Sequence, residues 1–405
     1  MNYKICVAGK NHIAINAINI LLSLKIEKES IMACYNDTDN GVNTWQPSFK
    51  SYCERKKIKA IKLQELYNLK DLYFFSLEFD KIIDIHKFKT DRIFNIHFSL
   101  LPKYKGMYTS IFPILNLDEE TGVTLHEIDN GIDTGDIIDQ IKFDIGDMTS
   151  LDVYNTYIEK GTELFERNIS KLLAGNYLKT QQSHKNSTYN SKTSIKFGET
   201  QIPLKQTAFE IVQWVKAFSF RPYQMAKYKS YSISHVRREI VKSENKAGYE
   251  IEDHEFYIKI ATIDYDVRLY KDKIAEIIHA TSINDVNYIR QILGWGYNIN
   301  DWGENGWTPL MVAAYHGCYE TVNLLVENGA DPNAINFNGT TILMYAMTNA
   351  ALTNDFRTFN YCLSLNSNLE HRDCRDKSIF DYAQNYQNKK IIDALNVKVK
   401  NDSIS

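Results

Sequence analysis

At 405 residues, the chain exceeds the length of one ordinary globular core, so we expect two or three domains. Its 47 Lys and Arg nearly balance 50 Asp and Glu, and the net charge of -3 excludes a nucleic-acid binder that relies on clustered positive charge. No run approaches the roughly 20 apolar residues of a membrane helix and the opening MNYKICVAGK lacks the pattern of an export signal, so we expect a cytoplasmic protein with neither a nucleic acid nor a membrane as partner.

Short β-rich apolar runs alternate with helical patterns over roughly the first 100 residues. Strand-like runs cover residues 5–8, 31–34, 72–75 and 93–95. This alternation predicts an α/β fold, with a Rossmann-like domain and a parallel-type sheet whose ligands gather beyond the carboxyl ends of the strands. A helical pattern from Tyr154 to Leu172 meets Gly175, a residue that favours a helix end. We expect this domain to span residues 1–180.

A polar stretch, residues 181–194, separates this domain from a region with mixed patterns and reads as a connection. Beyond it, a helical pattern around 211–218 is followed by alternating, strand-like segments at 255–261 and 264–270. The sequence therefore predicts a small α+β middle region over residues 181–270.

The last third of the chain carries an internal repeat near the 33-residue period of ankyrin repeats, with Gly306 and Thr308 recurring at Gly339 and Thr341. Its central unit, NGWTPLMVAAYHGCYETVNLLVENGADPN, resembles an ankyrin repeat almost completely. We expect an α-helical ankyrin-repeat domain over residues 271–398, built from about three helix pairs. Residues 399–405 form a tail.

The cysteines show no CxxC pairing and are scattered over the predicted domains, which indicates reduced thiols rather than disulfides or zinc ligands. They are Cys6, Cys34, Cys53, Cys318, Cys362 and Cys374. No spacing of His, Cys and Asp resembles a ligand set, so no metal is expected.

The densest group of chemically useful side chains lies in FNIHFSLLPKYKG and TGVTLHEIDNGIDTGDII. At strand spacing, Asn95 and His97 project to the same side at the carboxyl end of an apolar strand. Asp133 lies between Gly131 and Gly135, in a loop where glycines permit tight turns and close approach of the backbone to a ligand.

The order Asn-x-His-x-SLLP-x-x-x-Gly, Gly-Val-Thr-x-His and Asp-Thr-Gly closely resembles the formyltransferase family that uses N10-formyltetrahydrofolate. Every element of that family's motif is present, and the resemblance covers roughly residues 1 to 270. It implies that Asn95, His97 and Asp133 are catalytic and that N10-formyltetrahydrofolate is the co-substrate.

Formyl transfer to an amine requires chemical groups that these three residue types can supply. Asn95 can donate its amide hydrogens to the oxyanion of the tetrahedral intermediate. His97 can take a proton from the attacking amine or share the charge of the oxyanion. Asp133 can orient protonated His97 or accept the proton itself, and the sequence leaves the base open between these two.

In this family, the pterin lies along the backbone of the catalytic Asp loop and of a segment that precedes the catalytic Asn. The resemblance therefore implies eight cofactor-binding residues. They are Ser76, Leu77, Glu78, Phe79, Asp129, Asn130, Gly131 and Ile132. The alternative for the first segment is a plain exit from a strand into a loop.

Three further segments more closely resemble bacterial sugar N-formyltransferases that act on dTDP-linked amino-dideoxyhexoses, whereas the balanced charge argues against transfer RNA. They are SLLPKYKGMYTSIFP, Trp45-Gln46-Pro47-Ser48 and FSFRPYQMA. The resemblance implies a dTDP-3-amino-3,6-dideoxyhexose of the Qui3N or Fuc3N type, or else the 4-amino isomer, for lipopolysaccharide O-antigen biosynthesis.

A nucleoside diphosphate needs flat rings for its base, which Phe220 and Tyr223 offer, and a cation for its pyrophosphate, which Arg221 offers. Lys105 and Tyr108 follow the catalytic strand closely enough to line the sugar cavity. The candidate substrate-binding residues are Trp45, Lys105, Gly106, Met107, Tyr108, Phe220, Arg221 and Tyr223. A place in the core for the aromatic residues, and a solvated side chain for Lys105, are equal alternatives.

The ankyrin-like region has two interpretations. In the first, Trp295, Trp302 and Trp307 are packing residues of a structural domain that supports a homodimer. In the second, these rings help to form an accessory nucleotide-sugar pocket. Two alternatives for the whole chain also remain: a formyltetrahydrofolate hydrolase with the same triad, and a non-catalytic ankyrin-type binding or sensor protein.

Overall fold

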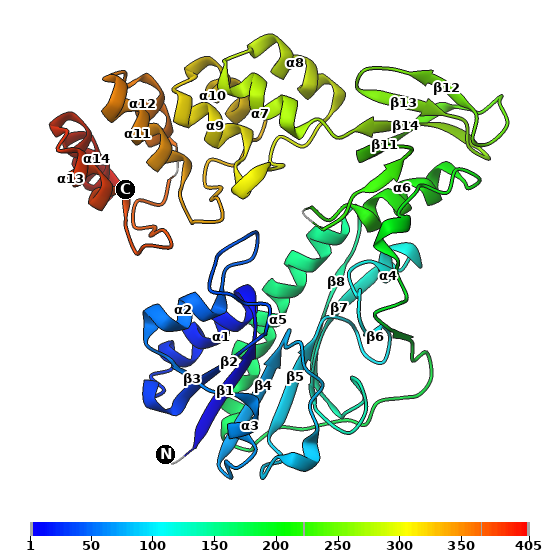
Figure 1. Cartoon of the computed structure of the whole chain (residues 1–405), viewed down its shortest axis with the longest axis vertical. Coiled ribbons are helices and arrows are strands. Elements are labelled where there is room, and N and C mark those ends of the chain that lie inside the picture. Colours follow the sequence, from blue (N-terminus) through cyan, green and yellow to red (C-terminus); the bar gives the residue numbers. More distant parts are fainter. Residues whose placement is uncertain (1–2, 222, 366, 403–405) are drawn as a thin grey trace. The chain divides into compact units, whose positions relative to one another are not determined.

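The computed structural model describes residues 3–221, 223–365 and 367–402 (Figure 1). The chain forms two compact units. The first comprises Met1–Val42 and Gln46–Lys271, and the second Asn43–Trp45 and Asp272–Ser405. Among the described residues, no helix is both long enough and apolar enough to cross a membrane.

A seven-stranded sheet forms the centre of the first unit, in the order β3-β2-β1-β4-β5-β7-β8. The strands are β1 (Lys4–Gly9), β2 (Ile31–Tyr35), β3 (Lys59–Ala60), β4 (Leu72–Leu77), β5 (Ile93–His97), β7 (Glu120–Glu127) and β8 (Ile137–Asp144). The predicted strands 31–34, 72–75 and 93–95 are all present. The strand order reverses between β1 and β4, so their carboxyl ends flank the crevice where such sheets bind ligands.

Strands β1 to β5 pair in parallel, as the sequence predicts. The predicted parallel-type sheet is therefore present, and β7 and β8, which were not among the predicted strands, add an antiparallel edge, because β7 runs antiparallel to both β5 and β8. The loop of residues 128–136 joins β7 to β8, and a connection of that length can link antiparallel strands but is too short for parallel ones.

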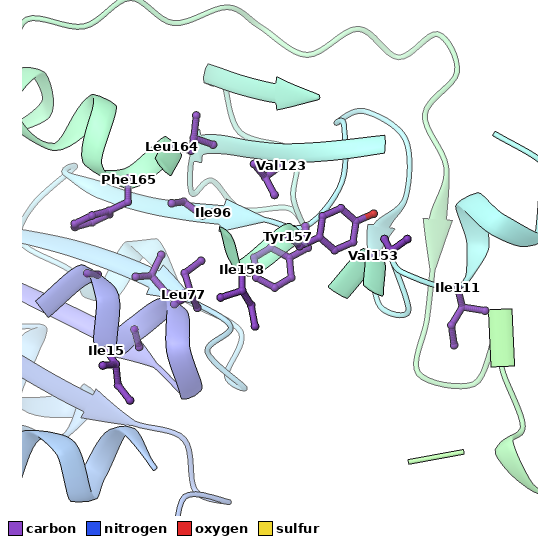
Figure 2. Close-up of a cluster of buried hydrophobic side chains, with 14 of the residues drawn as sticks. Ile15, Leu77, Ile96, Ile111, Val123, Val153, Tyr157, Ile158, Leu164 and Phe165 are labelled. Carbon is purple, nitrogen blue, oxygen red and sulfur yellow. The ribbon is translucent and has the colours of Figure 1, made fainter. Parts of the chain in front are cut away.

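Three helices, α1 (Asn11–Ser23), α2 (Phe49–Lys56) and α5 (Ser150–Leu173), pack on one face of this sheet. Figure 2 shows Ile15 of α1 and Phe165 of α5 in this buried cluster. Phe94 and Ile96 of β5 belong to that buried cluster, together with Phe165 of α5. The other face packs on the short helix α3 (Leu63–Leu66). Because neighbours in a strand alternate between faces, Asn95 and His97 are directed away from α5.

A second sheet, of five antiparallel strands, lies in the same unit, in the order β10-β11-β14-β13-β12. The strands are β10 (Ala226–Tyr228), β11 (Tyr231–Lys242), β12 (Glu250–Asp253), β13 (Tyr257–Ile260) and β14 (Tyr265–Lys271). Helix α6 (Ala208–Phe218) packs on it and on α4 (Phe112–Leu115). The predicted helix around 211–218 and the strand at 264–270 are therefore present.

The segment 181–194 is more than a connection. It contains the two-residue strand β9 (Tyr189–Asn190), which pairs in parallel with β6 (Lys105–Gly106) in the loop that follows β5. Two-residue strands leave no periodic pattern in a sequence, so the pairing could not be predicted.

Helix pairs form the second unit. Its helices are α7 (Ile274–Ser282), α8 (Val286–Trp295), α9 (Pro309–His316), α10 (Tyr319–Glu327), α11 (Ile342–Thr353), α12 (Arg357–Ser364), α13 (Ile379–Tyr386) and α14 (Lys389–Asp402). Thr308 and Thr341 cap the first helix of their pairs through side-chain bonds to Met311 and Met344. The described residues thus hold four pairs, one more than predicted, because the degenerate repeat after Ser378 still forms two helices.

Candidate active site

Asn95 and His97 lie at the carboxyl end of β5. In the sheet, β5 lies between β4 and β7, which also carry polar side chains here. Asn95 is paired in register with Ser76 on β4 and with His126 on β7. Its neighbours Phe94 and Ile96 anchor the strand in the core, so both polar side chains have a fixed direction.

The loop between β7 and β8, residues 128–136, turns back at Asp133, whose own backbone is left-handed, with φ of 54°. The Asp129 carboxylate accepts bonds from the Gly131 N–H (3.0 Å) and from the Thr134 hydroxyl (2.6 Å). At Gly135 the turn passes so close to Glu127 that a Cβ would lie 1.9 Å from the Glu127 carbonyl oxygen. These local features bring the Asp133 side chain back to the end of β5.

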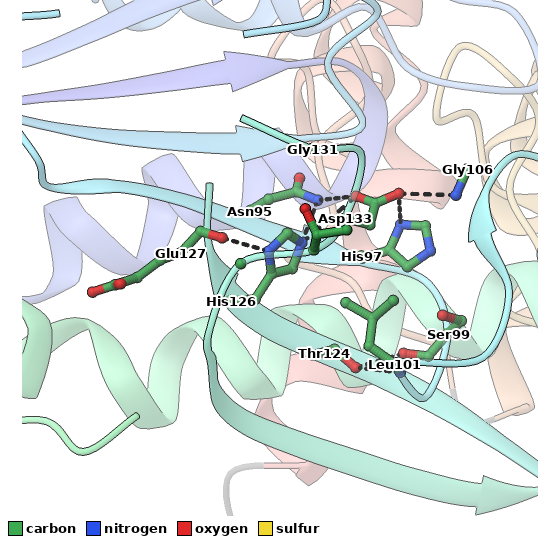
Figure 3. Close-up of polar contacts among 12 residues, drawn as sticks. Asn95, His97, Ser99, Leu101, Gly106, Thr124, His126, Glu127, Gly131 and Asp133 are labelled. Carbon is green, nitrogen blue, oxygen red and sulfur yellow. Dashed lines mark hydrogen bonds and ion pairs between the residues drawn. The ribbon is translucent and has the colours of Figure 1, made fainter. Parts of the chain in front are cut away.

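The three predicted catalytic residues meet around the Asp133 carboxylate (Figure 3). Oδ2 of Asp133 lies 3.4 Å from Nδ1 of His97 and accepts the Gly106 N–H at 2.9 Å. Oδ1 accepts a bond from Nδ2 of Asn95 at 3.3 Å. Residues that are far apart in the sequence therefore form one connected polar group.

His97 has a defined tautomer, because its Nε2 lies 2.8 Å from the carbonyl oxygen of Tyr104. A carbonyl oxygen can only accept, so Nε2 carries a hydrogen. Nδ1, which faces Asp133, is then the atom that gains or loses a proton. Tyr104 is itself held by Asp118 and Asn116 at its hydroxyl (2.7 and 2.9 Å), and by the Thr188 hydroxyl at its N–H (2.7 Å).

The charge state of Asp133 follows from its surroundings. Burial opposes its ionisation, but the neighbouring His97 and His126 rings and the Gly106 N–H outweigh this effect and hold the pKa of Asp133 well below its ordinary value. A carboxylate that is so easily ionised is a weak base. Asp133 is therefore the anion of this polar group, beside His97.

His126 joins this group, although the sequence analysis did not select it as a site residue. Its Nδ1 donates to the Glu127 carbonyl oxygen (2.7 Å), which leaves Nε2 to accept a bond from Nδ2 of Asn95 (3.0 Å). Both hydrogens of the Asn95 amide thus have partners, His126 and Asp133. The motif Gly-Val-Thr-x-His contained this residue, and its register opposite Asn95 was the missing information.

The first predicted cofactor-binding segment follows β4. Ser76 and Leu77 are buried strand residues, and Phe79 packs against Phe74. Glu78 has a left-handed backbone, with φ of 57°, and its carboxylate accepts bonds from the Asn11 amide and from the Tyr154 hydroxyl at 2.8 Å. This polar group lies at the crevice between β1 and β4.

The second predicted segment, Asp129–Ile132, is the outer part of the loop that carries Asp133. Asn130 and Gly131 are at its exposed tip, and Ile132 is exposed as well. The turn thus presents backbone and an apolar side chain next to Asp133.

The predicted sugar-binding residues after β5 differ in how far they are exposed to solvent. Lys105 is only 8% exposed, which excludes the solvated alternative, and Gly106 contacts Asp133 directly. Met107 is exposed, while the Tyr108 hydroxyl donates to the Lys192 carbonyl oxygen at 2.9 Å.

Phe220 and Tyr223 form a second aromatic group. The buried Phe220 ring packs on Tyr223 (5.4 Å between centroids) and on Tyr154 (5.4 Å), the residue that also binds Glu78. Tyr223 is 62% exposed, whereas Arg221 is half-buried. Trp45 belongs to the second unit, and its role remains a prediction.

Among the described residues, no group of three or more His, Cys, Asp or Glu could hold a metal ion. Five cysteines, Cys6, Cys34, Cys53, Cys318 and Cys362, are buried free thiols.

Known proteins resemble the chain in two separate regions. The family model of formyl transferases matches residues 80–169, and the model of ankyrin repeats matches residues 261–336 and 277–357. Curated relatives include methionyl-tRNA formyltransferases from Clostridium tetani, with 29% identity over 45% of this chain, and from Clostridioides difficile, with 28% over 42%. The chain spans 59% and 55% of the length of these relatives.

Two solved structures are considerably more similar. One is an N-formyltransferase from Helicobacter canadensis in complex with folinic acid and dTDP-3-aminofucose, 41% identical over 67% of this chain and 100% of that protein, with a TM-score of 0.61. The other is WlaRD, a sugar 3N-formyl transferase in the presence of dTDP and 5-N-formyl-THF, 42% identical over 67% and 98%, also with a TM-score of 0.61. The chain therefore belongs to the sugar N-formyltransferase family and carries ankyrin repeats in its C-terminal region.

Proposed function

We propose that this chain transfers the formyl group of N10-formyltetrahydrofolate to the amine of a dTDP-linked 3-amino-3,6-dideoxyhexose. The observation that carries the proposal is the likeness, at 41% and 42% identity, to two proteins that the chain spans almost completely. One of them holds dTDP-3-aminofucose and folinic acid, and the other is named a sugar 3N-formyl transferase.

In this proposal, His97 accepts the proton that the attacking amine loses. Its Nε2 hydrogen is occupied by the Tyr104 carbonyl oxygen, so the proton goes to Nδ1. Asp133, 3.4 Å from that atom, remains ionised and stabilises the imidazolium. Asp133 thus has the electrostatic role and His97 the role of the base.

Asn95 stabilises the oxyanion that forms when the amine attacks the formyl carbon. Both of its amide hydrogens have partners, so one hydrogen bond must be exchanged for the bond to the oxyanion. The contact with Asp133, at 3.3 Å, is longer than the contact with His126, at 3.0 Å, and is the one that we expect to be exchanged.

We propose that the pterin lies along Ser76–Phe79 and Asp129–Ile132, on two sides of the catalytic group, and that no metal takes part. The sugar of the nucleotide sugar would then contact the residues after β5. Phe220 and Tyr223 would contact its base, and Arg221 its pyrophosphate. The link from Phe220 through Tyr154 to Glu78 supports a common site for both ligands.

The direct test is incubation with N10-formyltetrahydrofolate and a panel of dTDP-linked 3-amino and 4-amino sugars, followed by measurement of the product mass. We expect formylation of the 3-amino sugars. Exclusive formylation of a 4-amino sugar would contradict the proposed substrate. Rapid formate release without an acceptor would favour the hydrolase, and no reaction at all would favour the sensor protein.

We further propose that the enzyme is a cytoplasmic homodimer and that its product is used in lipopolysaccharide O-antigen biosynthesis. Light scattering of the purified chain tests the dimer.

For the ankyrin unit, we propose a supporting role. Trp302 packs edge-on against Phe337 (5.1 Å between centroids), and Trp307 packs against Tyr345 (4.3 Å), as expected of packing residues. An accessory nucleotide-sugar pocket is the alternative. Calorimetry with the dTDP-sugar distinguishes them, since one site per chain favours support and two sites favour the pocket.

A further inference from the structure

Gln182 lies where the chain passes the loop that carries Asp133 after leaving α5. Thr180 pairs through its backbone with Ile137 at the start of β8, and Gln182 follows two residues later. Its side chain is only 8% exposed. The amide Nε2 donates to the carbonyl oxygens of Asp133 (2.9 Å) and Gly135 (2.7 Å). Gln182 therefore holds the turn that carries Asp133, a role outside the chemistry described above.

These two bonds fix the orientation of the amide. Both partners are carbonyl oxygens, which can only accept, so the atom that faces them is the nitrogen. Both hydrogens of Nε2 are thereby used. The remaining atom, Oε1, is buried and accepts no hydrogen bond from the described residues. Buried polar atoms nearly always have a hydrogen-bond partner, so we expect Oε1 to accept a hydrogen bond from a donor outside the chain.

The surroundings define the chemistry of that donor. Gln182 binds the main-chain carbonyl oxygen of Asp133, a residue whose carboxylate is ionised, so an anion is repelled. Ile132 is 41% exposed and offers an apolar contact. An uncharged flat ring with N–H groups on its edge meets both conditions.

We propose that Gln182 binds the folate co-substrate, with its Oε1 accepting a hydrogen bond from an N–H group of the pterin ring. This assignment rests on the proposed function, in which the pterin lies along Asp129–Ile132. One amide would then do two things: its nitrogen fixes the position of the catalytic Asp133, and its oxygen fixes the ring that carries the formyl group.

Substitution can separate the two halves of the amide. Gln182→Lys keeps a nitrogen that can donate to both carbonyl oxygens but has no acceptor. Gln182→Met lacks both functions at similar length. Gln181→Lys is the matched control, because it adds the same charge at the neighbouring, exposed residue. Calorimetry of each variant with 5-formyltetrahydrofolate, and separately with a dTDP-amino sugar, measures the two affinities.

We expect Q182K and Q182M to raise the Kd for 5-formyltetrahydrofolate by about tenfold or more, the effect of losing one buried hydrogen bond. The Kd of Q181K and every Kd for the dTDP-amino sugar should change less than about twofold. Unchanged folate affinity in both Gln182 variants overturns the assignment. A loss confined to the dTDP-amino sugar overturns it too, because the donor would then be the sugar.

Failure of the proposed function would look different, since the unaltered chain would itself bind no 5-formyltetrahydrofolate. If Q182K lacks a cooperative thermal transition, Q182M carries the test, because a neutral thioether can occupy the same buried space without introducing a charge.

Discussion

Nε2 of His97 lies 2.8 Å from the carbonyl oxygen of Tyr104, seven residues further along the chain. The tautomer of the imidazole is therefore set by main chain rather than by another side chain. A change that moves the Tyr104 carbonyl oxygen away from Nε2 would remove the contact that sets this tautomer. The shape of the loop and the acid-base chemistry of the site are thus coupled.

Replacing His97 tests the assignment of the base. We expect His97→Gln to lower kcat by about 10² to 10⁴, the usual contribution of a general base, while the circular dichroism spectrum stays the same. His184→Gln, at an exposed position, is the control and should retain full activity. Near-normal turnover of His97→Gln would refute the assignment.

Replacing Gly106 tests whether the shape of the loop that follows β5 matters for activity. Its φ is 85°, and a Cβ there would lie 2.3 Å from the Asn190 carbonyl oxygen, so Gly106→Ala must separate β6 from β9. The bond from the Gly106 N–H to Asp133 would be lost with it. We expect kcat to fall at least about tenfold. Gly175→Ala also has a positive φ, of 66°, but nothing within 4 Å, so it controls for backbone strain alone.

The lowered pKa of Asp133 predicts how stability depends on pH. Because its pKa is lower in the folded chain than in the unfolded one, ionised Asp133 stabilises the fold above the unfolded pKa of about 4, and this contribution disappears as the pH falls toward the folded value. We expect urea unfolding midpoints of the wild type to fall more steeply than those of Asp133→Asn between about pH 5 and 3. If the unfolding midpoints of the wild type and of Asp133→Asn fall equally with pH, this prediction is wrong.

Tyr104→Phe tests the anchor of the loop. The hydroxyl donates to Asp118 and accepts from Asn116, so its loss should lower the free energy of unfolding by about 1 to 3 kcal/mol. Because the Tyr104 carbonyl oxygen orients His97, we expect kcat to fall while KM for the nucleotide sugar stays constant. Tyr67→Phe is the control, since that ring packs on Phe88 and its hydroxyl has no hydrogen bond among the described residues. An equal effect in both variants would remove the special role of Tyr104.

Sequence patterns predicted much of this architecture. Periodicity identified the strands around Val7 and Phe94 and the helix that ends before Gly175, because burial on one side of an element leaves a regular pattern. The Asn-x-His spacing at the end of a strand indicated that Asn95 and His97 point the same way. Their meeting with Asp133 came from the family resemblance, not from the spacing.

The remaining features depend on contacts between distant residues. Nothing near Thr188 indicates that its hydroxyl holds the Tyr104 N–H, and nothing near Gln182 indicates that it holds the Asp133 turn. The role of His126 required the register of β5 against β7. Such partners depend on the tertiary fold, and local sequence patterns do not contain that information.

The pairing of β6 with β9 also has a consequence for how the enzyme loses function. Thr188 and Tyr104 are 84 residues apart, so the loop that follows β5 takes its shape only when a distant, weakly paired segment closes on it. Loop closure over such distances is slow to form, and short peripheral pairs are the first to open. During gradual denaturation, we therefore expect activity to disappear while the seven-stranded sheet is still intact.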